Sequence, residues 1–119
     1  MNKKTLVALV VALALSGCAT VDRTGYSSAA ANTAIPADQC NVTVYRSYNE
    51  AKANGEIEEL CTVYGNSSFS FIHTVAVALD RAKPKACECG ATNVYIKSSK
   101  PMGWSVAEVE LVAFRYKKK

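Results

Sequence analysis

The first apolar stretch of the chain runs without interruption from Thr5 to Leu15 and follows a short basic start, MNKK. A membrane-spanning helix needs about 20 apolar residues, whereas this run has 11. A basic start before a short apolar run is typical of a secretory signal peptide. The pattern therefore predicts that residues 1–17 direct export and are then removed.

A polar segment without a clear pattern follows. Residues 19–39 read ATVDRTGYSSAAANTAIPADQ and show no sustained helical or strand period. We therefore interpret residues 18–39 as a flexible tether, whose ends would lie about 25 Å apart on average as a coil.

Two strands are predicted next. In residues 41–45, NVTVY, valines alternate with polar neighbours, which is the pattern of a half-buried strand. Residues 46–56, RSYNEAKANGE, predict a turn because they contain an Asn-Gly breaker. The second strand covers 57–64, although Glu59 interrupts its alternation. We expect the two strands to pair as a hairpin.

The best-defined element is a helix within residues 69–90. Its apolar residues recur at spacings of three and four, so they form one stripe that would pack on a core. Residues 65–68 supply good N-cap residues, Pro84 predicts a kink or a break, and Gly90 suits the C-cap. The stripe consists of Ile72, Val75, Ala76, Leu79, Ala82 and Ala86.

Two further strands complete the domain, which we place at residues 40–116. TNVYIK and SVAEVELVAFRY read as strands separated by the turn SSKPMGW. In the last strand, Val109, Leu111 and Ala113 share one face. The order β-β-α-β-β predicts an α+β fold in which a small four-stranded sheet packs against one helix.

The signal peptide ends in a motif for lipid attachment. Leu15-Ser16-Gly17-Cys18 matches the bacterial lipobox, whose cysteine takes a diacylglyceryl group and becomes the first residue of the mature chain. Ala19 is not the aspartate that typically retains such lipoproteins in the inner membrane. The motif predicts an outer-membrane lipoprotein in which the tether holds a periplasm-facing domain away from the membrane.

Cysteine usage supports export. With Cys18 assigned to lipid, the five cysteines leave an even set, Cys40, Cys61, Cys87 and Cys89. In an oxidising compartment such a set most naturally forms two disulfides, each adding on the order of 2–4 kcal/mol to the stability of a small domain. We expect Cys40 and Cys61 each to pair with one of Cys87 and Cys89.

Charge narrows the range of partners. The net charge of +4 falls to +2 when Lys3 and Lys4 leave with the signal peptide. Nucleic-acid binding is disfavoured because it needs a broad basic face with interleaved aromatic residues. The basic tail, residues 117–119, is either a solvated end, a site of attraction to anionic surfaces, or a point of covalent attachment of Lys119 to peptidoglycan.

No catalytic constellation emerges from the sequence. His73 is the only histidine, which rules out a histidine-pair metalloprotease site. On a helix it would lie about 10 Å along the axis from Asp80, too far for a hydrogen bond. Cys87 and Cys89 form the best redox or metal alternative, although a redox pair usually has two intervening residues. We therefore predict a protein that is not an enzyme and holds no cofactor or metal.

Large side chains around the last turn form a candidate contact site for a partner. A turn aromatic that covers the end of a small core is the alternative interpretation. The residues are Tyr95, Met102, Trp104 and Tyr116.

A family resemblance is carried by residues 86–94, ACECGATNV. Ala86, Gly90, Ala91, Asn93 and Val94 match a phrase of the type Ala-x-x-x-Gly-Ala-Asn-x-Val, with Thr92 inserted, in which a helix ends before two strands. Together with the lipobox, the tether and four cysteines, the chain over 41–116 resembles the Rcs stress-sensor lipoproteins (RcsF) and the small YbjQ-like domains. The resemblance implies a disulfide-linked periplasmic domain that binds other envelope proteins.

We therefore expect an outer-membrane lipoprotein whose small periplasmic domain binds a protein partner, as an envelope-stress sensor or accessory. One alternative is a redox or metal-handling lipoprotein that uses Cys87 and Cys89. The other is a structural lipoprotein linked to the cell wall through its lysine tail.

Overall fold

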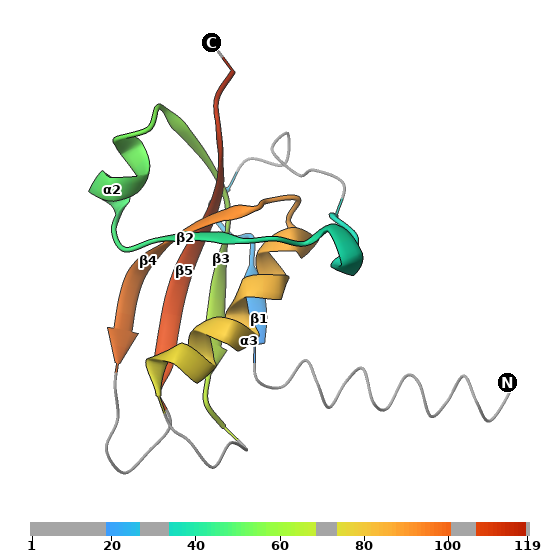
Figure 1. Ribbon diagram of the computed structural model, residues 1–119, viewed down its shortest axis with the longest axis vertical. Coiled ribbons are helices and arrows are strands. Elements are labelled where there is room, and N and C mark those ends of the chain that lie inside the picture. The colour runs from blue at the N-terminus through green and yellow to red at the C-terminus, as the bar shows by residue number, and fades with distance from the viewer. Residues whose placement is uncertain (1–18, 27–33, 69–73, 101–106, 119) are drawn as a thin grey trace, which may run out of the picture.

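Five strands form one mixed sheet in the computed structural model, which describes residues 19–26, 34–68, 74–100 and 107–118 (Figure 1). The strands are β1 Ala19–Asp22, β2 Thr43–Tyr45, β3 Ile57–Asn66, β4 Asn93–Lys100 and β5 Glu108–Tyr116, and the helices are η2 Ala37–Gln39, α2 Tyr48–Lys52 and α3 Val75–Glu88. The order across the sheet is β1-β3-β5-β4-β2; β2 and β4 run parallel, and the other neighbours run antiparallel. The α+β class is confirmed, whereas the predicted four-stranded sheet is corrected to five strands.

The additional strand, β1, lies in the segment predicted to be a flexible tether. It pairs with β3, placing Ala19 opposite Gly65 and Asp22 opposite Thr62. Hydrogen bonds from the side chain and the backbone of Thr24 to the Asp22 carboxylate end the strand in a turn and lower the pKa of Asp22. Four residues are too few to show a period in the sequence. The tether prediction is therefore wrong for β1, whose backbone groups are satisfied by the edge of β3.

β2 does not form the predicted hairpin with β3. It lies at the far edge of the sheet, parallel to β4, with Val44 opposite Val94. The segment between β2 and β3, predicted as a turn, contains α2. Ser47 caps α2 by accepting the backbone N–H of Glu50 at 3.1 Å, and the Glu50 carboxylate accepts the N–H of Arg46 at 2.9 Å. This reciprocal capping stabilises a short helix where the Asn-Gly signal indicated only a turn.

β3 is irregular next to the glutamate that interrupts its alternation. Its register with β5 shifts between Glu59 and Cys61, so Leu60 is an extra residue on this strand. Such a bulge changes which face the preceding and following side chains occupy. Cys61 and Val63 consequently pack beneath α3, while Ile57 packs with aromatic residues on the other face.

α3 begins later than its predicted cap. Its N-cap is Thr74, whose hydroxyl accepts the backbone N–H of Val77 at 3.3 Å. The predicted cap residues, 65–68, instead include the end of β3, because the pairing of β3 with β5 continues as far as Asn66. The beginning of the predicted helix, residues 69–73, lies outside the described residues.

The apolar stripe of α3 is displaced from the predicted one. Ala78 is buried, whereas Ala76, which was predicted to lie in the stripe, is exposed. The described residues of α3 that contact the core are Val75, Ala78, Leu79, Ala82 and Ala86.

The C-terminal half of α3 passes through Pro84 without the predicted break. Gly90 follows the helix with a φ of 77°, a conformation that favours glycine. The N–H groups of Gly90 and Ala91 bond to the carbonyls of Cys87 and Ala86 at 3.0 and 3.1 Å. This is a Schellman ending, so the predicted role of Gly90 is confirmed.

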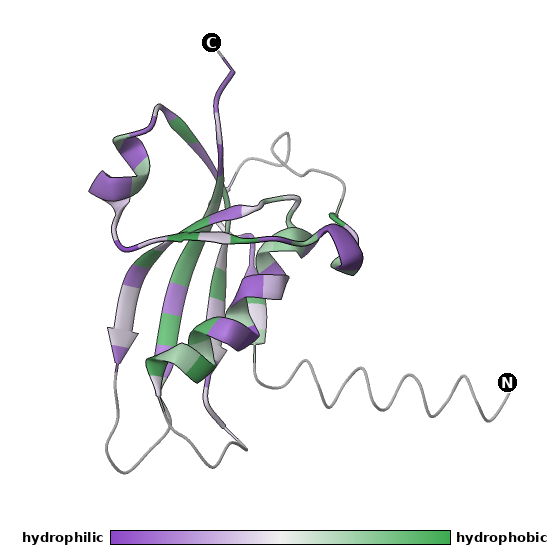
Figure 2. Ribbon diagram, viewed as in Figure 1, coloured by the Kyte–Doolittle hydropathy of each residue, from purple (hydrophilic) through white to green (hydrophobic). Residues whose placement is uncertain are grey.

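Small residues allow α3 to lie close to the sheet. A Cβ at Gly65 would lie 2.5 Å from the Ala78 carbonyl oxygen and 2.7 Å from the Ala82 Cβ. Figure 2 shows apolar and polar residues alternating along the start of β5, and Val109, Leu111 and Ala113 share the face that packs against α3. The sheet residues of this core are Leu60, Cys61, Val63, Ala91, Val94, Val109, Leu111 and Ala113.

The other face of the sheet carries an aromatic cluster beside α2. The Phe114 ring centroid lies 6.0 Å from that of Tyr95 and 5.3 Å from that of Tyr116. Tyr95 donates its hydroxyl to Glu59 at 2.7 Å, and Tyr116 donates to the Ala51 carbonyl at 2.7 Å. Burial, followed by the bond to Glu59, raises the pKa of Tyr95 well above its usual range. The polar atoms of this second core are therefore partnered.

Candidate functional site

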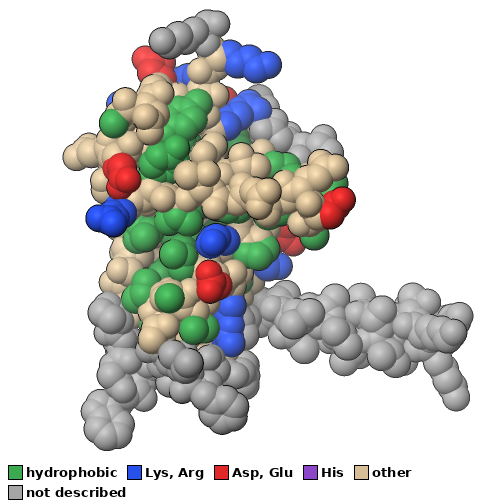
Figure 3. All heavy atoms as spheres, in the orientation of Figure 1, with side chains coloured by type: hydrophobic (Ala, Val, Ile, Leu, Met, Phe, Trp, Pro, Cys, Tyr) green, Lys and Arg blue, Asp and Glu red, His purple; other side chains and the backbone are tan. Residues whose placement is uncertain are grey.

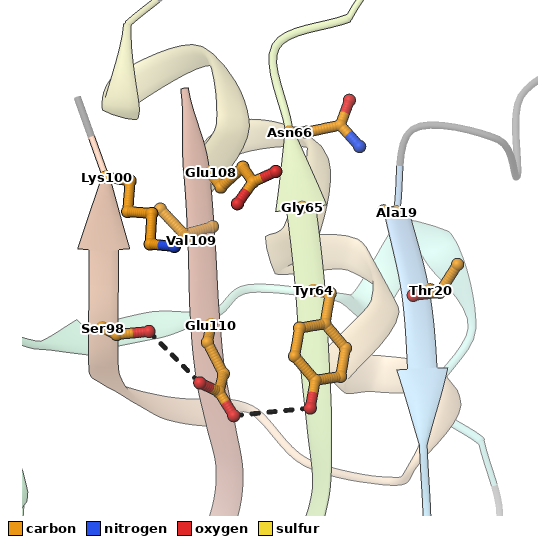
Figure 4. Close-up of a pocket in the computed structure, with 10 residues that line it drawn as sticks. All are labelled: Ala19, Thr20, Tyr64, Gly65, Asn66, Ser98, Lys100, Glu108, Val109 and Glu110. Carbon is orange, nitrogen blue, oxygen red and sulfur yellow. Dashed lines mark hydrogen bonds between the residues drawn. The ribbon is translucent and has the colours of Figure 1, made fainter. Parts of the chain in front are cut away.

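An open groove of about 300 Å³ crosses the sheet on the face opposite α3 (Figure 4). Side chains from four neighbouring strands line it in two rows. The first row, in direct register, is Thr20 of β1, Tyr64 of β3, Glu110 of β5 and Ser98 of β4. The second row, one pleat further along, is Asn66, Glu108 and Lys100.

Glu110 is the centre of the first row. Its carboxylate accepts the Tyr64 hydroxyl at 3.4 Å and the Ser98 hydroxyl at 3.1 Å. The ammonium group of Lys97 lies 3.7 Å from the same carboxylate. A bulge between Ile96 and Ser98 in β4 brings Ser98 into line with Glu110. Donors from two flanking strands thus fix the position of this carboxylate.

Tyr64 forms an exposed wall of the groove, with 41% of its surface accessible. Desolvation is the largest cause of a raised pKa for its phenol, followed by the negative charges of Glu110 and Asp22. The neutral phenol can donate a hydrogen bond and offers a ring face. Such a ring attracts cations as well as apolar groups.

Lys100 and Glu108 bring opposite charges to the second row. They are direct partners across β4 and β5, and both are exposed. Within the described ranges neither forms an ion pair. Figure 4 shows the Glu108 carboxylate directed toward β3, while the Lys100 side chain extends beside Val109. The groove therefore presents a cation and an anion to a ligand.

The groove offers several groups that can hold a polar ligand. The residues that line the groove include neither cysteine nor histidine. Across the described part of the chain, no three side chains of His, Cys, Asp or Glu gather to hold a metal. Charges of both signs, a tyrosine ring and several hydroxyl or amide groups remain for holding a polar ligand.

The four cysteines of the domain form two disulfides, Cys40–Cys87 and Cys61–Cys89, with Cα separations of 6.0 and 6.5 Å. The predicted pairing scheme is confirmed. Because Cys87 and Cys89 belong to different bridges, neither is a free thiol or a metal ligand in this structure. Two disulfides indicate an oxidising location outside the cytoplasm.

The segment before β2 is fastened to the C-terminal end of α3. The Arg23 guanidinium donates to the Glu88 carbonyl at 3.0 Å, and the Ile35 N–H donates to the Cys87 carbonyl at 2.8 Å. Carbonyls at a helix C-terminus lack intrahelical partners and favour a nearby cation. Together with the Cys40 bridge, these bonds hold residues predicted as tether against the domain.

The predicted partner-contact residues do not gather at one exposed site among the described residues. Tyr95 is only 7% exposed and belongs to the aromatic core, which corrects its assignment as a contact residue. Tyr116 is half-buried in the same cluster. Met102 and Trp104 lie outside the described residues, as do Cys18, His73 and Lys119.

Sequence reasoning did not find the groove residues, although part of the signal is present. The alternation EVELV predicts Val109 and Leu111 on one face, which leaves Glu108 and Glu110 together on the other. Nothing in the sequence indicates that Tyr64 and Ser98 flank Glu110. That arrangement depends on the strand order and on two bulges.

Basic and acidic side chains are interspersed on the face shown in Figure 3, so no broad basic surface forms there. Among the described residues, no helix is both long and apolar enough to cross a membrane. No family model, curated protein or solved structure matches this chain. The resemblance carried by residues 86–94 therefore stays a prediction.

Proposed function

We propose that this protein is an outer-membrane lipoprotein, anchored through Cys18, whose periplasmic domain binds another envelope protein. The observation that carries the proposal is the lipobox LSGC, which is followed by a domain with two disulfides. Lipobox and disulfides independently favour a protein outside the cytoplasm. The resemblance to the Rcs stress-sensor lipoproteins adds a role in reporting envelope stress through protein contacts.

The surface best placed for a protein partner is around α2. This helix and the C-terminal end of β5 lie at the end of the molecule far from the start of β1 (Figure 1). Tyr48 on α2 is 44% exposed, and the Lys52 ammonium lies 5.3 Å from its ring centroid. Partly exposed aromatic residues are common anchors of protein interfaces. In a protein anchored at Cys18, this end would face away from the membrane.

Intact mass of the protein purified from membranes without reductant tests the anchor. We expect a lipid-sized increment on Cys18 and no alkylatable thiol, because the other four cysteines are in disulfides. Cys18→Ala should remove the increment and either release the protein from the outer-membrane fraction or mislocalise it, while the domain still folds. Thr20→Ala, two residues away, should preserve both properties. An unmodified Cys18 in membrane-purified protein would contradict the proposal.

Site-specific photo-crosslinking in cells tests the partner surface. A benzophenone side chain at Tyr48 should give a discrete protein adduct, because it would lie in the contact. The same group at Asp38, which is also exposed but lies on η2, serves as the matched control. Equal adduct patterns from the two positions would argue against a partner site at α2.

A structural link to the cell wall is a second candidate, favoured by the position of the lysine tail. Lys117 and Lys118 are exposed beyond the end of β5, on the side away from β1's first residue. A tail displayed there can reach polymers that lie beyond the membrane surface. The test is a peptidoglycan-linked fraction that survives boiling in detergent and is lost when Lys119 is replaced by Ala.

A further inference from the structure

We propose that the groove on the open face binds the headgroup of a zwitterionic phospholipid from the membrane that holds the Cys18 anchor. This inference rests on the proposed lipid anchor and specifies how the domain lies relative to it. The domain would stand on the membrane surface with its groove in the headgroup layer, in contrast to a domain that hangs from a flexible tether.

The position of β1 is the first argument. Ala19 is buried and paired with Gly65, so the sheet begins one residue after Cys18. One extended residue spans at most about 3.4 Å, whereas the headgroup region on each side of a bilayer is roughly 5–8 Å thick. Ala19 and Thr20 also line the groove. The anchored end of the groove therefore lies within reach of lipid headgroups.

The direction of the strands is the second argument. β1 and β5 start at the same level of the sheet, because Gly65 and Asn66 of β3 face Ala19 and Glu108 respectively. From Glu108, β5 leads away over nine residues, or about 27 Å at the usual rise per strand residue. An anchor at Cys18 thus places the groove near the bilayer and Lys118 far from it (Figure 1).

Charge complementarity is the third argument. A zwitterionic headgroup carries a phosphate and an ammonium group a few bonds apart. In the groove, Lys100 supplies the cation for the phosphate, while Glu108 supplies a carboxylate for the ammonium group. The exposed Tyr64 ring adds a face that attracts cations. The volume of about 300 Å³ lies at the small end of the range for small-molecule sites.

Photo-crosslinking of the full lipidated chain in native membranes tests the inference. A benzophenone side chain at Thr20 should form a covalent adduct whose mass is that of a phospholipid. The same group at Lys118 should form none, because it would lie at the other end of β5. The charge reversal Lys100→Glu should lower the Thr20 lipid adduct about fivefold. Lys118→Glu makes the same charge change at the far end and should leave that adduct unchanged.

The outcomes separate this inference from the anchor itself. Lipid adducts at Thr20 that depend on Lys100 support the bound headgroup. A Cys18 that carries its lipid, combined with peptide adducts or no adduct at Thr20, overturns the headgroup site and leaves the anchor intact. Equal lipid adducts at Thr20 and Lys118 also overturn it, because they show a domain without fixed orientation. A Cys18 without lipid overturns both proposals.

Discussion

The two faces of the sheet differ in what covers them and in how they use polar groups. On one face, α3 packs over alanines, a glycine and the Cys61–Cys89 bridge, and the side chains at the contact are buried. On the other face, Tyr64 and Ser98 hydrogen-bond to Glu110 beside an open groove. β5 serves both faces with alternate residues. Substitutions on this sheet should therefore separate stability from recognition according to which face they change.

The largest effect should follow removal of the Cys61–Cys89 bridge from the covered face. Replacing both cysteines with Ala deletes a cross-link over a separation of 28 residues, so we expect the free energy of unfolding to fall by about 3–4 kcal/mol. Denaturant unfolding without reductant measures this change. Tyr64→Ala on the open face is the control, with an expected loss below about 0.5 kcal/mol. Equal losses of unfolding free energy in the two variants would contradict the proposal that the covered face provides stability and the open face provides recognition.

A close second is Gly65→Ala, which tests the contact between α3 and β3. The new Cβ would meet the Ala78 carbonyl and Ala82, so the helix must move, and we expect a loss of about 2–3 kcal/mol in thermal or denaturant unfolding. Gly25→Ala is the comparison, because its φ of 85° is unfavourable for alanine but no atom lies within 4 Å. That variant should lose only about 1 kcal/mol. If Gly65→Ala lowers the free energy of unfolding no more than Gly25→Ala does, α3 does not pack tightly against β3 at Gly65.

Tyr95→Phe tests the aromatic cluster at the protected end of the second face. Loss of the hydrogen bond to Glu59 should cost about 1 kcal/mol. Folding raises the pKa of Tyr95 above its usual 10.0. The neutral phenol therefore contributes fully to the free energy of unfolding below pH 10.0, and this contribution decreases as the pH rises above 10.0. Unfolding measured on either side of pH 10.0 should therefore show a shallower alkaline loss in Tyr95→Phe. An unchanged alkaline slope would contradict the assignment.

Glu110→Gln should have the smallest effect on stability, within about 0.5 kcal/mol, because the carboxylate lies beside the open groove. It should nevertheless lower the pKa of Tyr64, since the negative charge of Glu110 is one cause of its elevation. Ultraviolet titration of tyrosinate, with Tyr64→Phe identifying the signal, measures this shift. Glu108→Gln, one pleat away, should change that pKa less. The reverse order of the two effects would place the charge centre of the groove at Glu108.

Local signals in the sequence predicted the long elements and the C-terminal end of α3. The alternation of β5, the glycine ending of α3 and the even set of cysteines each depend on neighbours in the chain or on compartment chemistry. The short helix α2 also has a local signal, Ser47 followed by Glu50 three residues later, which the turn prediction did not use. Its omission was an error of interpretation rather than a lack of information.

Tertiary pairing was not predictable in the same way. β1 is four residues long and pairs with an edge of β3, and β2 pairs with β4, which follows it far along the chain. The groove depends on such pairing, because Thr20 comes from β1 and a bulge in β4 aligns Ser98 with Glu110. A side chain's face could be read from alternation, but its partners on neighbouring strands could not.

The directions of β1 and β5 have a mechanical consequence. A pull between a membrane-held Cys18 and a tail held by the cell wall would act along strands whose hydrogen bonds run across the direction of the force. Both ladders, β1 with β3 and β3 with β5, would then be strained in shear, with all their bonds resisting together. If β1 slipped free, extension would stop at Cys40, because its bridge to Cys87 fixes that residue to α3. The domain would thus lengthen by a limited step under tension while its core stayed folded.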